Sequence, residues 1–338
     1  MAKNDFTPWV EKHRPRRIDQ LIQQDTIKAE FQKIVETGNM PHMLLHGPPG
    51  TGKTSSILAL VMALFGPKRV GERILELNAS DERGIGVVRN KIIHFAKLKI
   101  GTADPDFPSP DFKIIILDEA DAMTADAQSA LRKVMESTTK VTRFVFICNY
   151  DHQILDAIKS RCSTFRFKQI SMDNCTMKLR SVADKEQLNV TEEALSAIAD
   201  ISQGDVRRAI NILQNVQYTN NELIDKQCVY NITSYVDESH IDKLWKIAST
   251  ANVATIYNNT KQFVNEGYPV FYILLAISKK IHSSTQLSDI NKARMNIMVS
   301  HCERRVIGGS NELIQLTALF SYMRGLIKYK MNLPIDTF

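Results

Sequence analysis

The sequence predicts an α/β domain built on a parallel sheet, followed by two smaller helical domains. A glycine-rich loop, GPPGTGKT, spans residues 47–54 between an apolar strand-like stretch and a helical stretch. Strand-like and helical patterns then alternate as far as about residue 168, which is typical of a doubly wound parallel sheet. Beyond that point, apolar residues recur mainly at helical spacing. We therefore expect three domains, at residues 1–168, 169–235 and 236–338.

The composition argues against several classes of protein. The 338 residues contain no apolar run as long as a membrane span and no signal-peptide core near the first residue, so we expect no membrane partner. The five cysteines are scattered without a C-x-x-C pair, which indicates a reducing compartment and argues against disulfides or a zinc site. The net charge of +6 permits an anionic partner without requiring one.

The N-terminal segment PWVEKHRPRR, residues 8–17, is interrupted by proline and cannot form one long helix. We expect it to form an extended arm that packs against the parallel-sheet domain. Its basic side chains are, by default, a solvated patch. A helix is expected to follow from about Asp25 to Glu36.

The glycine-rich loop fits the pattern G-x-x-x-x-G-K-[ST] at every fixed position. A short buried strand, MLLH at residues 43–46, is expected before it, and a helix with an apolar face after it. In that setting the glycines let backbone N–H groups surround phosphate oxygens, and the start of the helix adds its positive dipole end. Lys53 would reach the β- and γ-phosphates of a nucleoside triphosphate, and the Thr54 hydroxyl would coordinate Mg²⁺.

A second part of a nucleotide site follows further along the chain. RILELNAS, residues 73–80, is strand-like, and a helix is expected from about Gly84 onward. After a proline-containing loop at residues 101–111, the apolar strand FKIIILDEAD ends at Asp118 and Glu119. Asp118 would hold Mg²⁺ through water, and Glu119 would orient or activate the attacking water.

The next strand, RFVFICNY, follows an expected helix at residues 124–138 and ends at Asn149. A polar side chain at that strand end could contact the γ-phosphate or the lytic water, and the alternative is a turn-forming asparagine. Arg161 follows, between Ser160 and Cys162.

The remainder of the chain reads as helical. In SQGDVRRAINIL, residues 202–213, Asp205 is a helix cap, and Arg207 and Arg208 stand in the first turn. Cations there oppose the helix dipole, so we expect these arginines to meet an anion. From about Val236 onward the amphipathic helices carry no recognisable chemistry, and we expect an assembly module.

These motifs together resemble a known family. PWVEKHRP, GPPGTGKT, LNASDERGI, IIILDEAD, FICNY, SRC and GDVRRAIN, in this order, are similar to the small subunits of replication factor C, the eukaryotic and archaeal sliding-clamp loader. The resemblance implies an AAA+ RecA-like ATPase domain, a helical lid and a helical collar over the three expected domains. His13 stands where the family more often has tyrosine.

The resemblance also implies roles for the matching residues. Val10 and Arg14 would lie beside the adenine. Asn149 would be the first sensor, Arg207 the second sensor on the lid, and Arg161 an arginine finger that reaches a neighbouring subunit's ATP. Asp118 and Glu119 would be the Walker B pair. The phosphates would be surrounded by Gly47, Pro48, Pro49, Gly50, Thr51, Gly52, Lys53, Thr54 and Ser55.

The implied partners are the other subunits of a heteropentameric clamp loader, a ring-shaped sliding clamp of the PCNA type, and primer–template DNA. The implied location is the nucleus, or the cytoplasm if the source is archaeal. Arg83, near a helix start, would face duplex DNA together with Arg89 and Lys91, the alternative being a solvated basic face.

Other functional classes remain to be weighed. The string DEAD also occurs in a class of helicases, but those enzymes carry two RecA-like lobes, whereas the second half here is helical. A branch-migration or origin-recognition ATPase is a second alternative, and the SRC motif argues against it. A subunit that binds ATP without hydrolysing it is a third, and Lys53, Asp118 and Glu119 argue against it.

Overall fold

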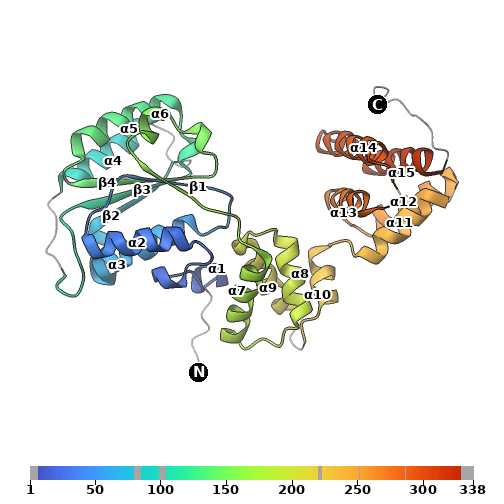
Figure 1. Ribbon diagram of the computed structural model, residues 1–338, viewed down its shortest axis with the longest axis horizontal. Coiled ribbons are helices and arrows are strands. Elements are labelled where there is room, and N and C mark those ends of the chain that lie inside the picture. The colour runs from blue at the N-terminus through green and yellow to red at the C-terminus, as the bar shows by residue number, and fades with distance from the viewer. Residues whose placement is uncertain are drawn as a thin grey trace. The chain divides into compact units, whose positions relative to one another are not determined.

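The computed structural model describes residues 7–79, 85–98, 104–219, 223–250, 252–285 and 287–328, except for the side chains of residues 85–89, 97 and 238. It consists of two compact units, Met1–Asp225 and Lys226–Phe338 (Figure 1). The first unit contains the parallel sheet together with the helices of residues 169–219, and the described part of the second unit consists of helices and the segments that connect them. The expected division into three domains stays a prediction.

A five-stranded parallel sheet forms the centre of the first unit, in the order β2-β3-β4-β1-β5. The strands are β1 Met43–His46, β2 Ile74–Asn78, β3 Lys113–Asp118, β4 Thr142–Cys148 and β5 Ser163–Arg166. The central strands are buried along almost their whole length, because both faces of a parallel sheet are covered by helices. The predicted α/β fold class is therefore confirmed.

Helices cover the sheet on both faces (Figure 1). Alternate strand residues point to opposite faces. Met43 and Leu45 of β1 pack in the cluster that contains helices α2 (Asp25–Thr37) and α3 (Lys53–Arg73). Leu44 packs in the opposite cluster, whose helices are α4 (Ile85–Lys97), α5 (Ala125–Thr138) and α6 (Asp156–Lys159). The connections that lead from the strands to these helices begin at the carboxyl ends of the strands. The polar residues of the sequence motifs lie at the same ends.

The N-terminal arm, residues 8–17, differs from the expectation. Pro8 precedes a single helical turn, α1 (Trp9–Lys12), whose main contact is with helix α9 (Val206–Thr219). Further along the chain, the short 3₁₀ turn η1 (Ile18–Gln20) packs against α2 and α3 of the sheet domain. The prolines stop the helix early, but they do not determine the surface on which it packs.

The remaining helices of the first unit are α7 (Met172–Lys185) and α8 (Glu192–Ser202), which pack against each other and against α9. Two further 3₁₀ turns, η2 (Ala120–Ala122) and η3 (Asp151–Gln153), follow β3 and β4. Both of these turns lie directly after the polar ends of their strands.

The second unit contains six described helices, and the last five of them share one apolar core. No helix of the described ranges is long and apolar enough to cross a membrane. The helices are α10 (Lys226–Thr233), α11 (Glu238–Thr250), α12 (Val253–Asn265), α13 (Val270–Ser283), α14 (Asp289–Ile307) and α15 (Glu312–Lys328).

A buried lysine fixes the end of helix α4. Lys113, the first residue of β3, is 1% exposed, and its Nζ atom donates to the carbonyl oxygen of Phe95 at 2.8 Å and to that of Leu98. The ammonium also lies 4.9 Å from the centre of the Phe95 ring. The last carbonyls of a helix have no partner within the helix, so this cation supplies a donor to the Leu98 carbonyl and a second donor to the Phe95 carbonyl, which also accepts the Leu98 N–H at 3.3 Å.

Lys113→Met should lower the free energy of unfolding by about 1–2 kcal/mol, since the apolar chain fills the space but removes the charged donor from the Phe95 and Leu98 carbonyls. Urea unfolding measures the loss, and faster amide exchange in α4 than in α5 would locate it. Lys33→Met, at an exposed position of α2, is the control and should change neither quantity. Equal stability and equal exchange in the Lys113 variant would contradict the capping role.

Candidate nucleotide-binding site

The glycine-rich loop lies where β1 ends and α3 begins. Gly47, Gly50 and Gly52 have φ values of 144°, 68° and 90°, in the region that favours glycine. A Cβ atom on Gly47 would lie 2.4 Å from the carbonyl oxygen of Phe167, so a larger residue would displace the backbone. The loop therefore runs close to the backbone after β5 and ends at the N-terminus of a long helix, where free N–H groups suit an anion.

Lys53 is the buried cation of this loop. Its side chain is 7% exposed, and its Nζ atom donates to the carbonyl oxygens of Gly47 at 2.7 Å and Pro48 at 2.9 Å. A third bond of 2.8 Å runs to Oδ1 of Asn149 at the end of β4. All three acceptors are neutral, and burial lowers the pKa of the Lys53 ammonium. A partly desolvated cation with neutral partners is well suited to bind an anionic phosphate.

Thr54 and Asp118 bring together the two halves of the predicted Mg²⁺ site. The Thr54 hydroxyl donates to Oδ2 of Asp118 at 2.8 Å, and the other oxygen of that carboxylate accepts the backbone N–H of Glu119 at 2.9 Å. Hydroxyl and carboxylate oxygens are ligands that Mg²⁺ prefers. The donor set therefore fits the ion. Glu119 follows with a φ of 53° and an exposed side chain.

Asn149 is also held from its backbone, by a residue to which sequence reasoning gave no role. Oδ2 of Asp121 accepts the backbone N–H groups of Asn149 at 2.9 Å and Tyr150 at 3.1 Å. Asp121 therefore ties the turn after β3 to the end of β4, and so orients the amide that contacts Lys53. The last letter of the string DEAD was the only signal of it in the sequence.

A pocket opens beside the loop, with an apolar side suited to a flat base. The predicted residues Val10, Arg14, Ser55 and Arg207 all line it. His13, Lys178 and Ile210 also line it, and sequence reasoning assigned none of these to the site. Burial, with a smaller effect of neighbouring Lys185, lowers the pKa of the Lys178 ammonium.

The loop and helix α9 are in direct contact. The backbone N–H of Val206 donates to the carbonyl oxygen of Gly50 at 3.3 Å. Asp205 accepts the N–H of Arg208 at 3.0 Å, as predicted for a helix cap, and a Cβ atom on Gly50 would lie 1.8 Å from Oδ1 of the same aspartate. Arg207 is exposed in the first turn of α9, where it borders the pocket.

The structure does not bring Arg161 to the loop. Its guanidinium donates to the carbonyl oxygen of Ala157 at 2.7 Å and to Oε1 of Glu136 at 2.8 Å, and its side chain is 39% exposed. It therefore lies on the surface formed by α5 and α6.

The predicted DNA-contacting residues are only partly described. Arg83 lies outside the described residues. Arg89 belongs to helix α4, but its side chain is not described. Lys91 is exposed on the same helix.

Comparisons with known proteins place the chain in a family. Residues 43–170 match the ATPase family associated with various cellular activities, residues 177–216 match the RCF1/5-like AAA+ ATPase lid domain, and residues 236–322 match the replication factor C C-terminal domain. The chain is 39% identical over 312 residues to replication factor C subunit 4 of Arabidopsis thaliana, covering 91% of this chain and 92% of the relative. The chain belongs to the replication factor C small-subunit family.

Other relatives come from both eukaryotes and archaea, the two groups that the motifs indicated. Replication factor C subunit 2 of Schizosaccharomyces pombe is 40% identical, with 93% of each chain covered. The replication factor C small subunit of Archaeoglobus fulgidus is 39% identical, with 96% of this chain and 99% of the relative covered. The predicted family and its AAA+ ATPase character are therefore confirmed, and the ATPase domain implies nucleotide binding.

Among solved structures, the Holliday junction branch migration motor RuvB of Thermotoga maritima has a similar fold. The TM-score is 0.53 at 17% identity, over 70% of this chain and 78% of that chain. At this identity the similarity concerns the fold alone. The family therefore rests on the closer sequence relatives, and the branch-migration alternative is not favoured.

Gly50→Ala should raise the Kd for ATP by roughly tenfold or more, which corresponds to about 1.4 kcal/mol, because the added methyl group collides with Asp205. Isothermal titration of the full chain measures the change. Gly71→Ala in α3 is a matched control, since a Cβ there meets nothing within 4 Å. An unchanged Kd in the Gly50 variant would show that the contact between the loop and α9 is not needed for binding.

Proposed function

We propose that this chain is an ATPase subunit of a heteropentameric clamp loader, which opens a ring-shaped sliding clamp of the PCNA type and loads it onto primer–template DNA in replication and repair. The observation that carries the proposal is the hydrogen-bonded set of Lys53, Thr54, Asp118 and Asn149 in a chain of the replication factor C family. ATP binding would close the assembly and open the clamp, and DNA would trigger hydrolysis.

At the site, Lys53 would exchange its neutral acceptors for the β- and γ-phosphate oxygens of ATP. Thr54 and Asp118 would hold Mg²⁺, which when bound neutralises charge on those oxygens. Glu119 would orient the attacking water and take up its proton. Asn149 would remain beside Lys53 and sense the γ-phosphate.

The base would lie in the pocket beside Val10 and Arg14, and Arg207 would approach the phosphates from α9. Pro48, Pro49, Thr51 and Ser55 would complete the loop around the phosphates. The contact between Gly50 and Val206 supports this arrangement, because it brings the first turn of α9 to the loop.

Arg161 would act on a neighbouring subunit. Its position on the exposed surface of α5 and α6 supports this assignment, since the guanidinium is free to leave the exposed Glu136 carboxylate for a stronger anion. A planar and permanently charged fork can offset the charge that develops on a transferred phosphoryl group.

We also propose that Arg83, Arg89 and Lys91 contact duplex DNA through its phosphates and that the complex works in the nucleus, or in the cytoplasm of an archaeon. Arginine and lysine side chains at phosphates position a protein on DNA without reading its sequence. Co-purification of the tagged chain with a ring clamp and four other subunits, followed by mass analysis, tests the proposed partners. Recovery of the chain without any of them would contradict the assignment.

Glu119→Gln should leave ATP binding intact but slow single-turnover hydrolysis by about 10²- to 10⁴-fold, because the amide cannot accept a proton from water. Rapid-quench measurement on the assembled complex, with the other sites inactivated, isolates this subunit. Lys53→Ala is the comparison, because it should lose binding itself. Normal hydrolysis in the Glu119 variant would assign the base to another residue, and no hydrolysis in wild type would mark a subunit that binds ATP without turnover.

Arg161→Ala should leave hydrolysis at this chain's own loop nearly unchanged and slow it at one adjacent subunit by on the order of 10³-fold or more. The assay uses complexes in which only one of the two sites is active. Arg132→Ala is the control, because Arg132 is an exposed arginine of α5 that pairs with the same Glu136 at 3.5 Å. A defect in this chain's own site, with the neighbour's site unaffected, would show that the finger does not act in trans.

A further inference from the structure

One carboxylate ties the N-terminal arm to helix α7. Glu186, the residue directly after α7, lies 13% exposed between the side chains of Lys12 and His13 of the arm. Nζ of Lys12 is 2.7 Å from its Oε1 and 2.9 Å from its Oε2, and Nε2 of His13 is 2.6 Å from Oε1. The His13 side chain is 5% exposed, so this contact is largely shielded from water.

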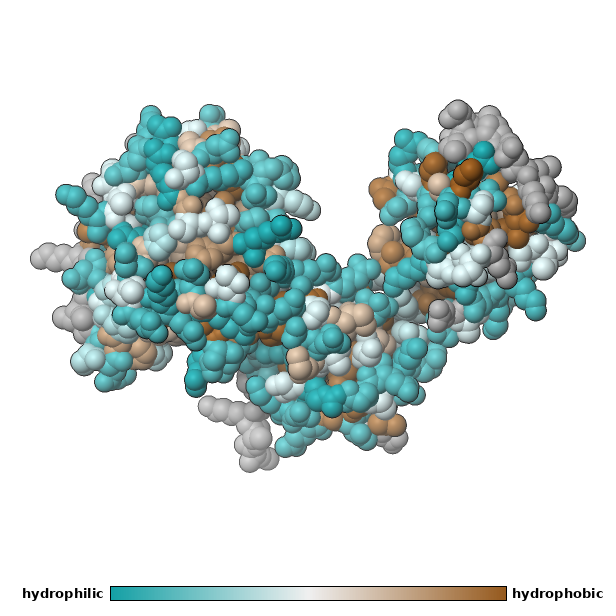
Figure 2. Space-filling view, viewed as in Figure 1, coloured by the Kyte–Doolittle hydropathy of each residue, from teal (hydrophilic) through white to brown (hydrophobic). Residues whose placement is uncertain are grey.

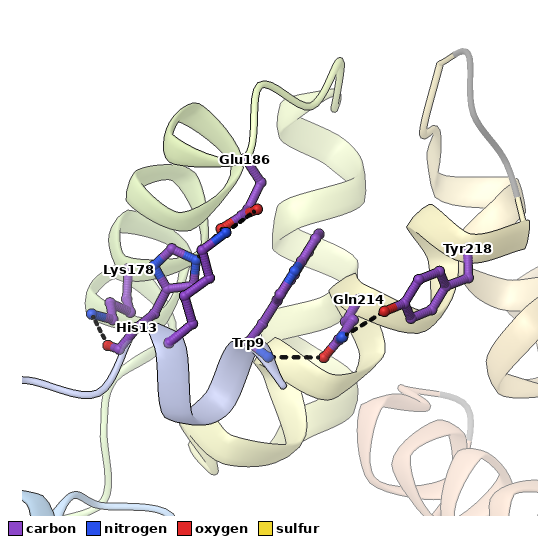
Figure 3. Close-up of polar contacts among 7 residues, drawn as sticks. Trp9, His13, Lys178, Glu186, Gln214 and Tyr218 are labelled. Carbon is purple, nitrogen blue, oxygen red and sulfur yellow. Dashed lines mark hydrogen bonds and ion pairs between the residues drawn. The ribbon is translucent and has the colours of Figure 1, made fainter. Parts of the chain in front are cut away.

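Further hydrogen bonds fix the direction in which the arm runs (Figure 3). Lys178 of α7 donates to the carbonyl oxygen of His13 at 3.3 Å, so residue 13 is held through both its side chain and its backbone. At the other end, the N–H of Trp9 donates to Oε1 of Gln214 at 3.2 Å, and Gln214 donates to the Tyr218 hydroxyl at 3.0 Å. The arm therefore spans from α7 to α9.

The arm is docked by polar contacts together with partial burial of two apolar side chains. In α1, Trp9 and Val10 are half-buried and Glu11 and Lys12 are exposed, and His13 at its end is the first fully buried residue of the arm. The next apolar anchors, Ile18 and Leu21, belong to the core of the sheet domain. Half-burial of Trp9 contributes through the hydrophobic effect, but it does not fix the direction of the segment, whereas the shielded Glu186 carboxylate holds two adjacent side chains at defined positions.

The carboxylate stays ionised near neutral pH. Burial alone would raise the pKa of Glu186, but the hydrogen bonds and positive charges of Lys12 and His13 outweigh it and leave that pKa below its ordinary value. The stabilisation is therefore present above the ordinary glutamate pKa and is lost as pH falls through the lowered value. Lys178 also faces His13, and Lys185 lies near Lys178.

The same arm forms one wall of the nucleotide pocket. Val10, His13 and Arg14 line that pocket, whereas Glu186 does not. We propose that Glu186 is a positioning residue for nucleotide binding: through Lys12 and His13 it docks the arm on α7 and so holds Val10 and Arg14 beside the base. This inference rests on the proposed assignment of the pocket to the base of ATP.

The arm carries its own reporter. The chain has two tryptophans, and Trp245 lies in the other unit, so the fluorescence of a Trp245→Phe chain reports on Trp9 alone. In that background Glu186→Gln should shift the Trp9 emission to the red, because the arm leaves α9 and becomes solvated. Glu192→Gln is the matched control, since Glu192 forms an exposed ion pair with Arg180 and does not touch the arm.

The nucleotide readout uses the full chain with ATP and Mg²⁺. Glu186→Gln should raise the Kd for ATP by about five- to tenfold, a loss consistent with removing one charged hydrogen-bonding partner. In the assembled complex KM should rise by a similar factor while kcat is retained, because the phosphate loop is untouched. Glu186→Asp should recover part of the affinity, and Glu192→Gln should bind as wild type does. Circular dichroism and thermal unfolding confirm that each variant is folded.

Two results would overturn the inference. An unchanged Trp9 emission in Glu186→Gln would show that the carboxylate does not hold the arm. A shifted emission with wild-type ATP affinity would show that the position of the arm does not control binding. A wild-type chain that bound no ATP would instead overturn the proposed function, and the positioning role with it, so the two failures are distinguishable.

Discussion

The desolvation of the Lys53 ammonium is the constraint on which the nucleotide site depends. The side chain lies in the loop at 7% exposure, and its partners are two carbonyl oxygens of the loop and the amide oxygen of Asn149. Neutral acceptors only partly compensate for the lost water, so an anion is favoured beside this group. Keeping the cation in place requires the loop to turn back on itself, which is why glycine stands at Gly47, Gly50 and Gly52.

Much of the fold and of this site could be predicted from the sequence, because the signals are local. The strand at residues 43–46 was predicted with its observed bounds, and the polar ends of β3 and β4 were predicted from where apolar runs stop. Parallel strands place their carboxyl ends at one edge. The contacts of Thr54 with Asp118 and of Lys53 with Asn149 follow from that rule, although no sequence pattern gives their distances.

What could not be predicted joins residues far apart in the chain with no periodic signal between them. Asp121 holds the backbone of Asn149, Lys113 caps a helix from a neighbouring strand, and Glu186 pairs with His13. Each uses an ordinary polar residue whose partner is set by tertiary packing. The arm also could not be placed from the sequence. Its prolines predict a broken helix, but the surface that the arm covers depends on a carboxylate more than 170 positions away.

The walls of the pocket come from separate parts of the first unit. The sheet supplies the phosphate loop, while the base wall comes from the arm and from α7 and α9. The arm is docked on those helices rather than on the sheet. A ligand that contacts both sides must therefore bias their relative arrangement, because it gains contacts only when the two walls are at the correct distance. The hydrogen bond from the Val206 N–H to the Gly50 carbonyl, at 3.3 Å, joins two backbones, so a movement of the loop reaches the first turn of α9, where Arg207 lies. A ligand that fills the pocket and touches the loop would therefore contact helix α9 through both the loop and the wall of the pocket.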